Sequence, residues 1–98
     1  MLKVTLVKCV SLKDDDVGGL SDPYVEFEVA GQKEKSTTKQ NNLNPVYNET
    51  FVFRDVPKHL HDLKVKVLDA DTGRDDKLGL VFLLVLTHAH TYHKFMQK

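Results

Sequence analysis

Short stretches in which apolar and polar residues alternate recur along the chain, and they limit what it can fold into. Alternation with period two puts successive side chains on opposite faces of a strand, so each stretch predicts a strand with one buried face. Such stretches span about residues 2–9, 25–29, 51–54 and 63–69, and residues 33–39 are expected to continue the hairpin as a polar strand. Turn-forming residues separate them, and no segment shows a convincing helical period. The sequence therefore predicts an all-β protein, folded as an antiparallel sandwich.

Size, charge and cysteine content narrow the class further. The 98 residues fit one domain, with enough apolar side chains to form a core without a metal. Lys plus Arg and Asp plus Glu number 14 each, and this balance argues against general nucleic-acid binding. The single cysteine, Cys9, cannot form an internal disulfide, which favours a reducing compartment. Because no secretory signal or membrane-spanning run is evident, we expect a cytoplasmic protein.

Two polar stretches, 11–23 and 68–79, carry crowded aspartates. The first holds Asp14, Asp15, Asp16 and Asp22, and the second holds Asp69, Asp71, Asp75 and Asp76. Two unit charges about 4 Å apart repel by roughly 4 kcal/mol at an effective dielectric near 20, so this crowding needs an explanation. Ordinary turns, in which Asp side chains bond their own backbone, are one explanation. A cation site is the other.

The strand pattern favours a cation site shared by the two acidic stretches. Alternate connections of a sandwich emerge at the same end, so the stretches could converge there. Calcium takes roughly six to eight oxygen ligands, whereas zinc and copper favour imidazole or thiolate. Neither stretch contains a histidine, and Cys9 lies within a predicted strand. Calcium is therefore the cation that fits best.

Three segments, in order and at their separations, resemble the C2 domain, the calcium-dependent phospholipid-binding module. They are LSDPYVEFEV (20–29), LNPVYNETFVF (43–53) and VLDADTGRDDKLG (67–79). The likeness covers about residues 1–80. It implies an eight-stranded antiparallel Greek-key sandwich of type II topology, with calcium held between loops at one edge.

By position in these motifs, the resemblance implies which residues bind calcium: Asp16, Asp22, Asp69, Asp71 and Asp76. The loop after Asp71 is one residue shorter than in many C2 domains, so Asp75 is an alternative to Asp76, and Asp15 is a further candidate for the metal shell. Bound calcium would reverse the negative potential of the loops and admit anionic lipid headgroups. The expected lipid contacts are Val17, Leu20 and Arg74.

Several lysines form a candidate basic face for phosphoinositides: Lys33, Lys35 and Lys39. A solvated sheet face is the favoured explanation, because glutamates lie among these lysines and dilute their field.

The sequence departs from the C2 pattern after Gly79, so we expect a C2-like sandwich over 1–80 and a divergent segment over 81–98 that packs partly as a strand. The last one or two strands of the sandwich are expected to be lacking or altered, with 80–86 as the sixth strand and 90–96 attempting a seventh. An incomplete sandwich leaves a sheet edge open, which predicts homodimer formation through that edge.

Two functions remain in competition. The first is calcium-dependent binding to anionic phospholipid membranes, which would make the cytoplasmic domain a peripheral membrane protein when calcium binds. The second is a calcium-independent module on the same fold that binds a protein partner. The aspartates favour the first, because without a metal nothing offsets their mutual repulsion. No enzyme activity is expected, since the serines lack a nearby base and no glycine-rich phosphate loop is present.

Overall fold

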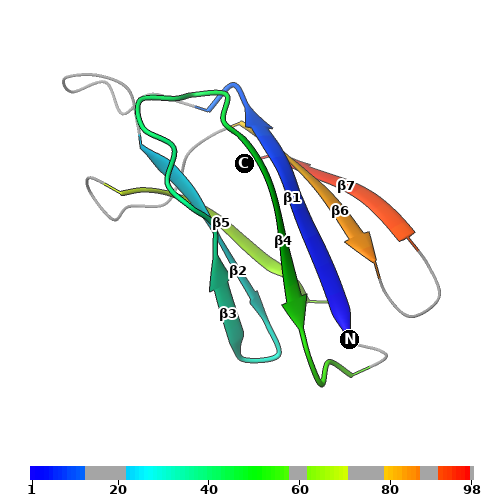
Figure 1. Ribbon diagram of the computed structural model, residues 1–98. Coiled ribbons are helices and arrows are strands. Elements are labelled where there is room, and N and C mark those ends of the chain that lie inside the picture. The colour runs from blue at the N-terminus through cyan, green and yellow to red at the C-terminus, as the bar shows by residue number, and fades with distance from the viewer. Residues whose placement is uncertain (13–21, 58–61, 71–78, 87–90, 98) are drawn as a thin grey trace.

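A computed structural model describes residues 1–12, 22–57, 62–70, 79–86 and 91–97, the last segment by its backbone. The described residues form strands and no helix, as the alternation predicts (Figure 1). The strands are β1 (Leu2–Val10), β2 (Pro23–Val29), β3 (Gln32–Lys35), β4 (Val46–Phe53), β5 (Lys64–Asp69), β6 (Leu80–Leu86) and β7 (Thr91–Gln97). Accordingly, this part of the chain contains no helix long and apolar enough to cross a bilayer.

The strands form two antiparallel sheets. One has four strands in the order β4-β1-β6-β7, and the other has three in the order β3-β2-β5. Figure 1 shows the two sheets as separate layers, with β1 and β4 on one and β2 and β3 on the other. The predicted antiparallel sandwich is confirmed.

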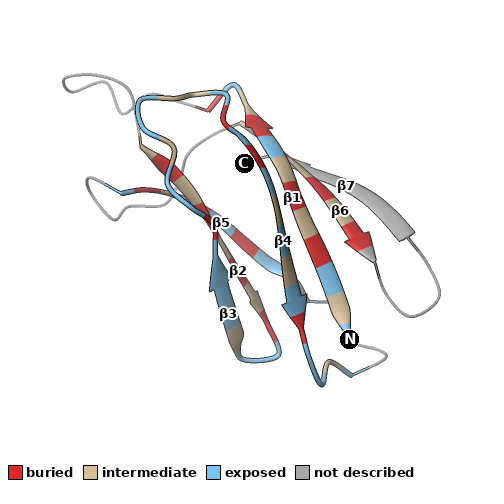
Figure 2. Ribbon diagram, viewed as in Figure 1, coloured by how far each residue is buried: buried red, intermediate tan, exposed pale blue. Residues whose placement is uncertain are grey.

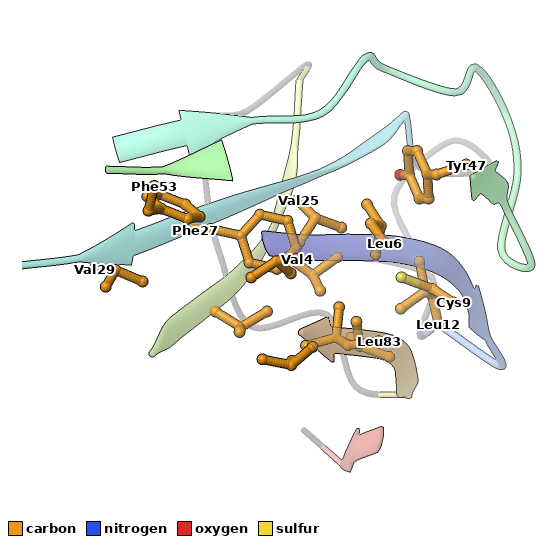
Figure 3. Packing of buried hydrophobic residues seen from close by; sticks show 14 residues of the cluster. Val4, Leu6, Cys9, Leu12, Val25, Phe27, Val29, Tyr47, Phe53 and Leu83 are labelled. Carbon is orange, nitrogen blue, oxygen red and sulfur yellow. The ribbon is translucent and has the colours of Figure 1, made fainter. Parts of the chain in front are cut away.

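The core lies between the two layers. Its side chains come from alternate positions of the strands, which Figure 2 shows as buried bands along β1, β2 and β6. Val4, Leu6, Val25 and Phe27 lie together in the middle of this cluster (Figure 3). The predicted inward face of β2 is confirmed, because Val25, Phe27 and Val29 are buried and the intervening glutamates are not.

A bulge in β1 changes the alternation that the sequence shows. The register with both neighbouring strands shifts between Leu6 and Lys8. Relative to β6, β1 has one extra residue here, which reverses which of its side chains face inward, so Cys9 is buried and Lys8 stays exposed. Burial raises the pKa of the Cys9 thiol to about 12, so this side chain stays neutral at physiological pH and packs as an apolar group.

Strands β3 and β4 differ from the predicted bounds. β3 begins after a two-residue turn, Ala30–Gly31, in which both residues have positive φ and Val29 pairs with Gln32, as in a type I′ hairpin. It ends at Lys35 rather than Lys39, because Ser36 turns inward and its Oγ accepts a hydrogen bond from the Val25 N–H. β4 begins five residues before Phe51, where the alternation is clearest.

The apolar run after Gly79 is a strand in the middle of its sheet. β6 pairs with β1 on one side and with β7 on the other. Val81, Leu83 and Val85 are buried, whereas Leu80, Phe82 and Leu84 are half-buried on the outer face. The described residues thus form seven strands, against the eight that the resemblance implies. The division of the chain at residue 80 stays a prediction, although β6 and β7 join the sheet that contains β1.

Gly79 lies where β6 begins, in close contact with the end of β1. A Cβ atom at this position would lie 2.7 Å from the Val10 carbonyl oxygen and 3.0 Å from the Ser11 carbonyl oxygen. Its φ of 154° also disfavours any residue with a side chain. We expect Gly79→Ala to lower the free energy of unfolding by about 2 kcal/mol in urea denaturation.

Gly31→Ala is the matched control, because Gly31 also has positive φ but a Cβ there would meet no atom within 4 Å. Its expected effect is about 1 kcal/mol, from the backbone alone. An effect of Gly79→Ala no larger than that of Gly31→Ala would show that the close approach to β1 is wrong.

Candidate metal site

Asp22 and Asp69 lie side by side at one end of the sandwich. Asp22 directly precedes β2, and Asp69 is the last residue of β5, where it pairs with Pro23. The Asp22 N–H donates a long hydrogen bond of 3.4 Å to Asp69 Oδ1, although the two residues are 47 positions apart. The Ala70 N–H donates to the Asp22 carbonyl oxygen at 2.9 Å. The end of the first acidic stretch therefore meets the start of the second.

Burial removes the carboxylates of Asp22 and Asp69 partly or almost wholly from water. Asp69 is 4% exposed and Asp22 is half-buried. A charged carboxylate removed from water needs a hydrogen bond, an opposite charge or a metal to offset the lost hydration. Carboxylate oxygens from two elements are the hard donors that calcium prefers. The two carboxylates are therefore oxygen donors of a kind that suits calcium, which needs several more.

The connection between β3 and β4, residues 36–45, is hydrogen-bonded to Asp22 and Pro23. The Asn41 N–H donates to Asp22 Oδ1 at 2.8 Å. At the next residue, the Pro23 carbonyl accepts hydrogen bonds from the Lys39 N–H at 3.0 Å and from the Tyr47 hydroxyl at 2.7 Å. The backbone and the carboxylate of the Asp22–Pro23 pair are therefore both fixed by this connection.

Tyr47 is buried at the edge of the core, next to this end of the sandwich (Figure 3). Burial raises the pKa of its hydroxyl well above the usual value, so the hydroxyl remains protonated and available as a donor. The Lys39 ammonium lies 5.7 Å from the centre of the Tyr47 ring. The ring thus links the core to the segment that supports Asp22.

The same connection holds the end of β1. The Cys9 N–H donates to the Pro45 carbonyl and the Leu12 N–H donates to the Leu43 carbonyl, both at 2.9 Å. The Ser11 N–H donates to Asn44 Oδ1 at 2.8 Å. Residues 12 and 22, near the two ends of the first acidic stretch, are therefore both hydrogen-bonded to this connection.

Of the predicted ligands, the structure describes Asp22 and Asp69 and brings them together. Within the described ranges, no group of three or more His, Cys, Asp or Glu side chains is placed to hold a metal. The other predicted ligands and lipid contacts lie outside those ranges: Asp15, Asp16, Val17, Leu20, Asp71, Arg74, Asp75 and Asp76. Their roles stay predictions.

The candidate basic lysines lie in two places. Lys33 and Lys35 are exposed on β3, directly opposite Glu28 and Glu26 of β2. Lys39 lies beyond the end of β3, against Tyr47. Glutamates thus directly neighbour the β3 lysines, as the interpretation of a solvated face requires.

Sequence reasoning assigned no role at the site to Tyr47 or Asn41. A signal for Tyr47 was present, because it lies in phase with Phe51 and Phe53 in β4 and therefore faces inward. For Asn41 the signal was weaker: its positive φ of 50° suits asparagine, but the donor is its backbone N–H.

Comparison with known families decides what kind of domain this is. Residues 1–96 match the sequence profile of the C2 domain. The chain belongs to the C2 domain family. The match extends beyond residue 80, where the likeness between motifs ended.

Relatives of this C2 domain occur in plants and animals. A protein of Arabidopsis thaliana named calcium-dependent lipid-binding protein is 42% identical over 83 residues, covering 84% of this chain and 16% of that protein. Synaptotagmin-1 of Homo sapiens is 41% identical over 90 residues, covering 84% of this chain and 21% of that protein. The chain thus spans about a fifth of the length of these relatives.

Solved structures agree with the assignment. A C2 domain of a plant extended synaptotagmin 1 superposes with a TM-score of 0.60 at 30% identity, over 87% of this chain and 66% of that one. A calcium-bound structure of two C2 domains of extended synaptotagmin 2 superposes with a TM-score of 0.62 at 26% identity, over 87% of this chain and 33% of that one. Another C2 domain shares the fold, with a TM-score of 0.67 at 24% identity, over 95% of this chain and 75% of that one.

Tyr47→Phe removes the hydroxyl that donates to the Pro23 carbonyl and keeps the ring. We expect it to lower the free energy of unfolding by about 1 kcal/mol in urea denaturation, the usual loss for one buried hydrogen bond. The loss stays modest because the Lys39 N–H still donates to the same carbonyl.

Tyr24→Phe is the control, since Tyr24 lies half-buried on β2 and its hydroxyl has no hydrogen bond within the described residues. We expect a change within about 0.5 kcal/mol. Equal losses in the two variants would contradict a special role for the Tyr47 hydroxyl.

Proposed function

We propose that this C2 domain binds calcium at the end of the sandwich where Asp22 and Asp69 meet, and that the calcium-bound form binds anionic phospholipid membranes. The observation that carries the proposal is the contact between these two aspartates across the β2–β5 pairing. The contact joins the Asp22 backbone to the Asp69 carboxylate, so one residue from each acidic stretch lies at this point.

The remaining ligands are proposed from the two stretches that adjoin this point: Asp16, Asp71 and Asp76. Asp15 and Asp75 would serve as additional members of the metal shell. Together with Asp22 and Asp69, such a set supplies the several carboxylate oxygens that calcium requires. With fewer ligands than this, a single carboxylate pair would compete poorly with water for the ion.

Electrostatics explains how calcium would control membrane binding. Without the metal, clustered carboxylates give this end a negative potential that repels acidic headgroups. Bound calcium reverses the sign and offers coordination positions to lipid phosphate or carboxylate oxygens. Val17, Leu20 and Arg74 are the proposed lipid contacts. The domain would then be cytoplasmic and would attach to the membrane as a peripheral protein.

The relatives support this proposal. The Arabidopsis thaliana relative is named for calcium-dependent lipid binding, and the structure of extended synaptotagmin 2 is calcium-bound. The competing function, a calcium-independent module that binds a protein partner, predicts the same fold with no response to calcium. An experiment on calcium dependence separates the two.

Calcium should stabilise the protein and recruit it to acidic vesicles. At about a hundredfold excess over Kd, binding to the folded state alone raises the free energy of unfolding by about 2.7 kcal/mol. We expect the protein to sediment with vesicles of phosphatidylcholine and phosphatidylserine in calcium but not in chelator, and not with phosphatidylcholine alone. Salt should weaken the binding.

Asp69→Asn and Asp22→Asn should each weaken calcium binding at least tenfold by titration calorimetry, because each removes one charged oxygen donor. Asp55→Asn is the matched control: Asp55 is exposed beyond the end of β4, and its positive φ suits asparagine. Unchanged stability in millimolar calcium, with vesicle binding insensitive to chelator, would sink the calcium proposal.

A further inference from the structure

We propose that the outer edge of β5 is a docking site for an extended segment of a partner protein whose solvent-facing side chains are acidic. The segment would add to the three-stranded sheet as a fourth strand beside β5. This inference concerns a different surface from the calcium site and does not depend on calcium binding.

The sheet order leaves this edge available. β5 is the last strand of β3-β2-β5, and it pairs with β2 from Lys64 to Asp69. No strand of the described ranges pairs with its other edge, and the facing sheet has one strand more. The six residues of β5 contain neither proline nor glycine, so the strand can present a regular row of backbone donors and acceptors.

The side chains of β5 specify what kind of strand would fit. Val65 and Val67 are buried, whereas Lys64 and Lys66 are exposed on the outer face. An added strand in register would therefore need apolar residues facing inward and residues that suit lysine facing outward. Opposite charges across neighbouring strands stabilise the pair.

Charge alternates across the outer face of this sheet. One row reads Lys35, Glu26, Lys66 and the next reads Lys33, Glu28, Lys64, each residue directly opposite its neighbour. Both of these rows end in a lysine at the β5 edge, and the row that follows, Tyr24 and Leu68, carries no charge. Acidic residues on the added strand would continue the alternation, as β2 already does on the other side of β5.

The same lysines disfavour a second copy of the chain as the occupant. In a symmetric antiparallel pairing of two β5 strands, outer residues oppose outer residues. If the two-fold axis passes through Lys66, the Lys66 side chains of the two copies lie opposite each other. If it passes through Val65, Lys64 of one copy lies opposite Lys66 of the other. An axis through Val67 leaves the two Lys66 side chains diagonal neighbours. Like charges thus oppose the homodimer expected from the sequence, and lysines on edge strands are a known guard against such pairing.

The test uses two synthetic peptides on the whole protein. One carries the sequence of β2, PYVEFEV, which already pairs with β5 in the fold, and the other replaces both glutamates by lysine. We expect the acidic peptide to bind about tenfold more tightly than the basic peptide and to slow hydrogen exchange of β5 amides measured by NMR.

Charge reversal locates the site. Lys64→Glu combined with Lys66→Glu should reverse the preference between the two peptides. Because this variant sets glutamates opposite Glu28 and Glu26, a circular dichroism spectrum like that of the unchanged protein is needed to show that the fold persists. Lys33→Glu combined with Lys35→Glu is the matched control on the opposite edge strand, β3, and should leave the preference for the acidic peptide in place.

Three results would overturn the proposal. One is no binding of either peptide at millimolar concentration, and another is a preference that reverses in the β3 variant instead of the β5 variant. The third is a dimer by light scattering whose formation protects the β5 amides, because this edge would then be occupied by a second copy.

Discussion

The antiparallel pairing of β2 with β5 is the constraint on which the candidate site depends. It places Pro23 opposite Asp69, so the residue before β2 and the last residue of β5 meet although they are far apart in sequence. The same pairing fixes Glu26 and Glu28 beside the β5 lysines and leaves the other edge of β5 at the margin of the sheet. One strand pair therefore sets both the position of the proposed calcium site and the charge pattern of the sheet.

Asp22 is held in place by groups other than Asp69. The connection between β3 and β4 supplies this support, through the Asn41 N–H to the Asp22 carboxylate and the Lys39 N–H to the Pro23 carbonyl. Tyr47 joins this support to the core, because its buried ring packs there while its hydroxyl reaches the same carbonyl. At the proposed site, Asp22 would therefore lose little conformational entropy when a cation binds.

Sequence reasoning predicted the sandwich, the inward faces of β2 and β5, and the meeting of two acidic stretches at one end. These features depend on local alternation and on a general property of sandwiches, so a single sequence reveals them. The bulge that buries Cys9 was not predicted, because one inserted residue depends on the register of two partner strands. The bond from Tyr47 to Pro23 was missed for a similar reason: it joins residues 24 positions apart, which local patterns do not connect. The position of β6 beside β1 was not evident from the sequence either, because it depends on pairing between strands far apart along the chain.

The most direct test of the account is a calcium titration followed by NMR of backbone amides. If calcium binds where the two aspartates meet, the amides of Asp22, Asn41 and Ala70 should shift together along one saturating curve. The amides of Gly31 and Asp55, in turns away from the site, should stay unchanged. Shifts absent from the first three amides at saturating calcium, or larger at Gly31 and Asp55, would contradict the central claim.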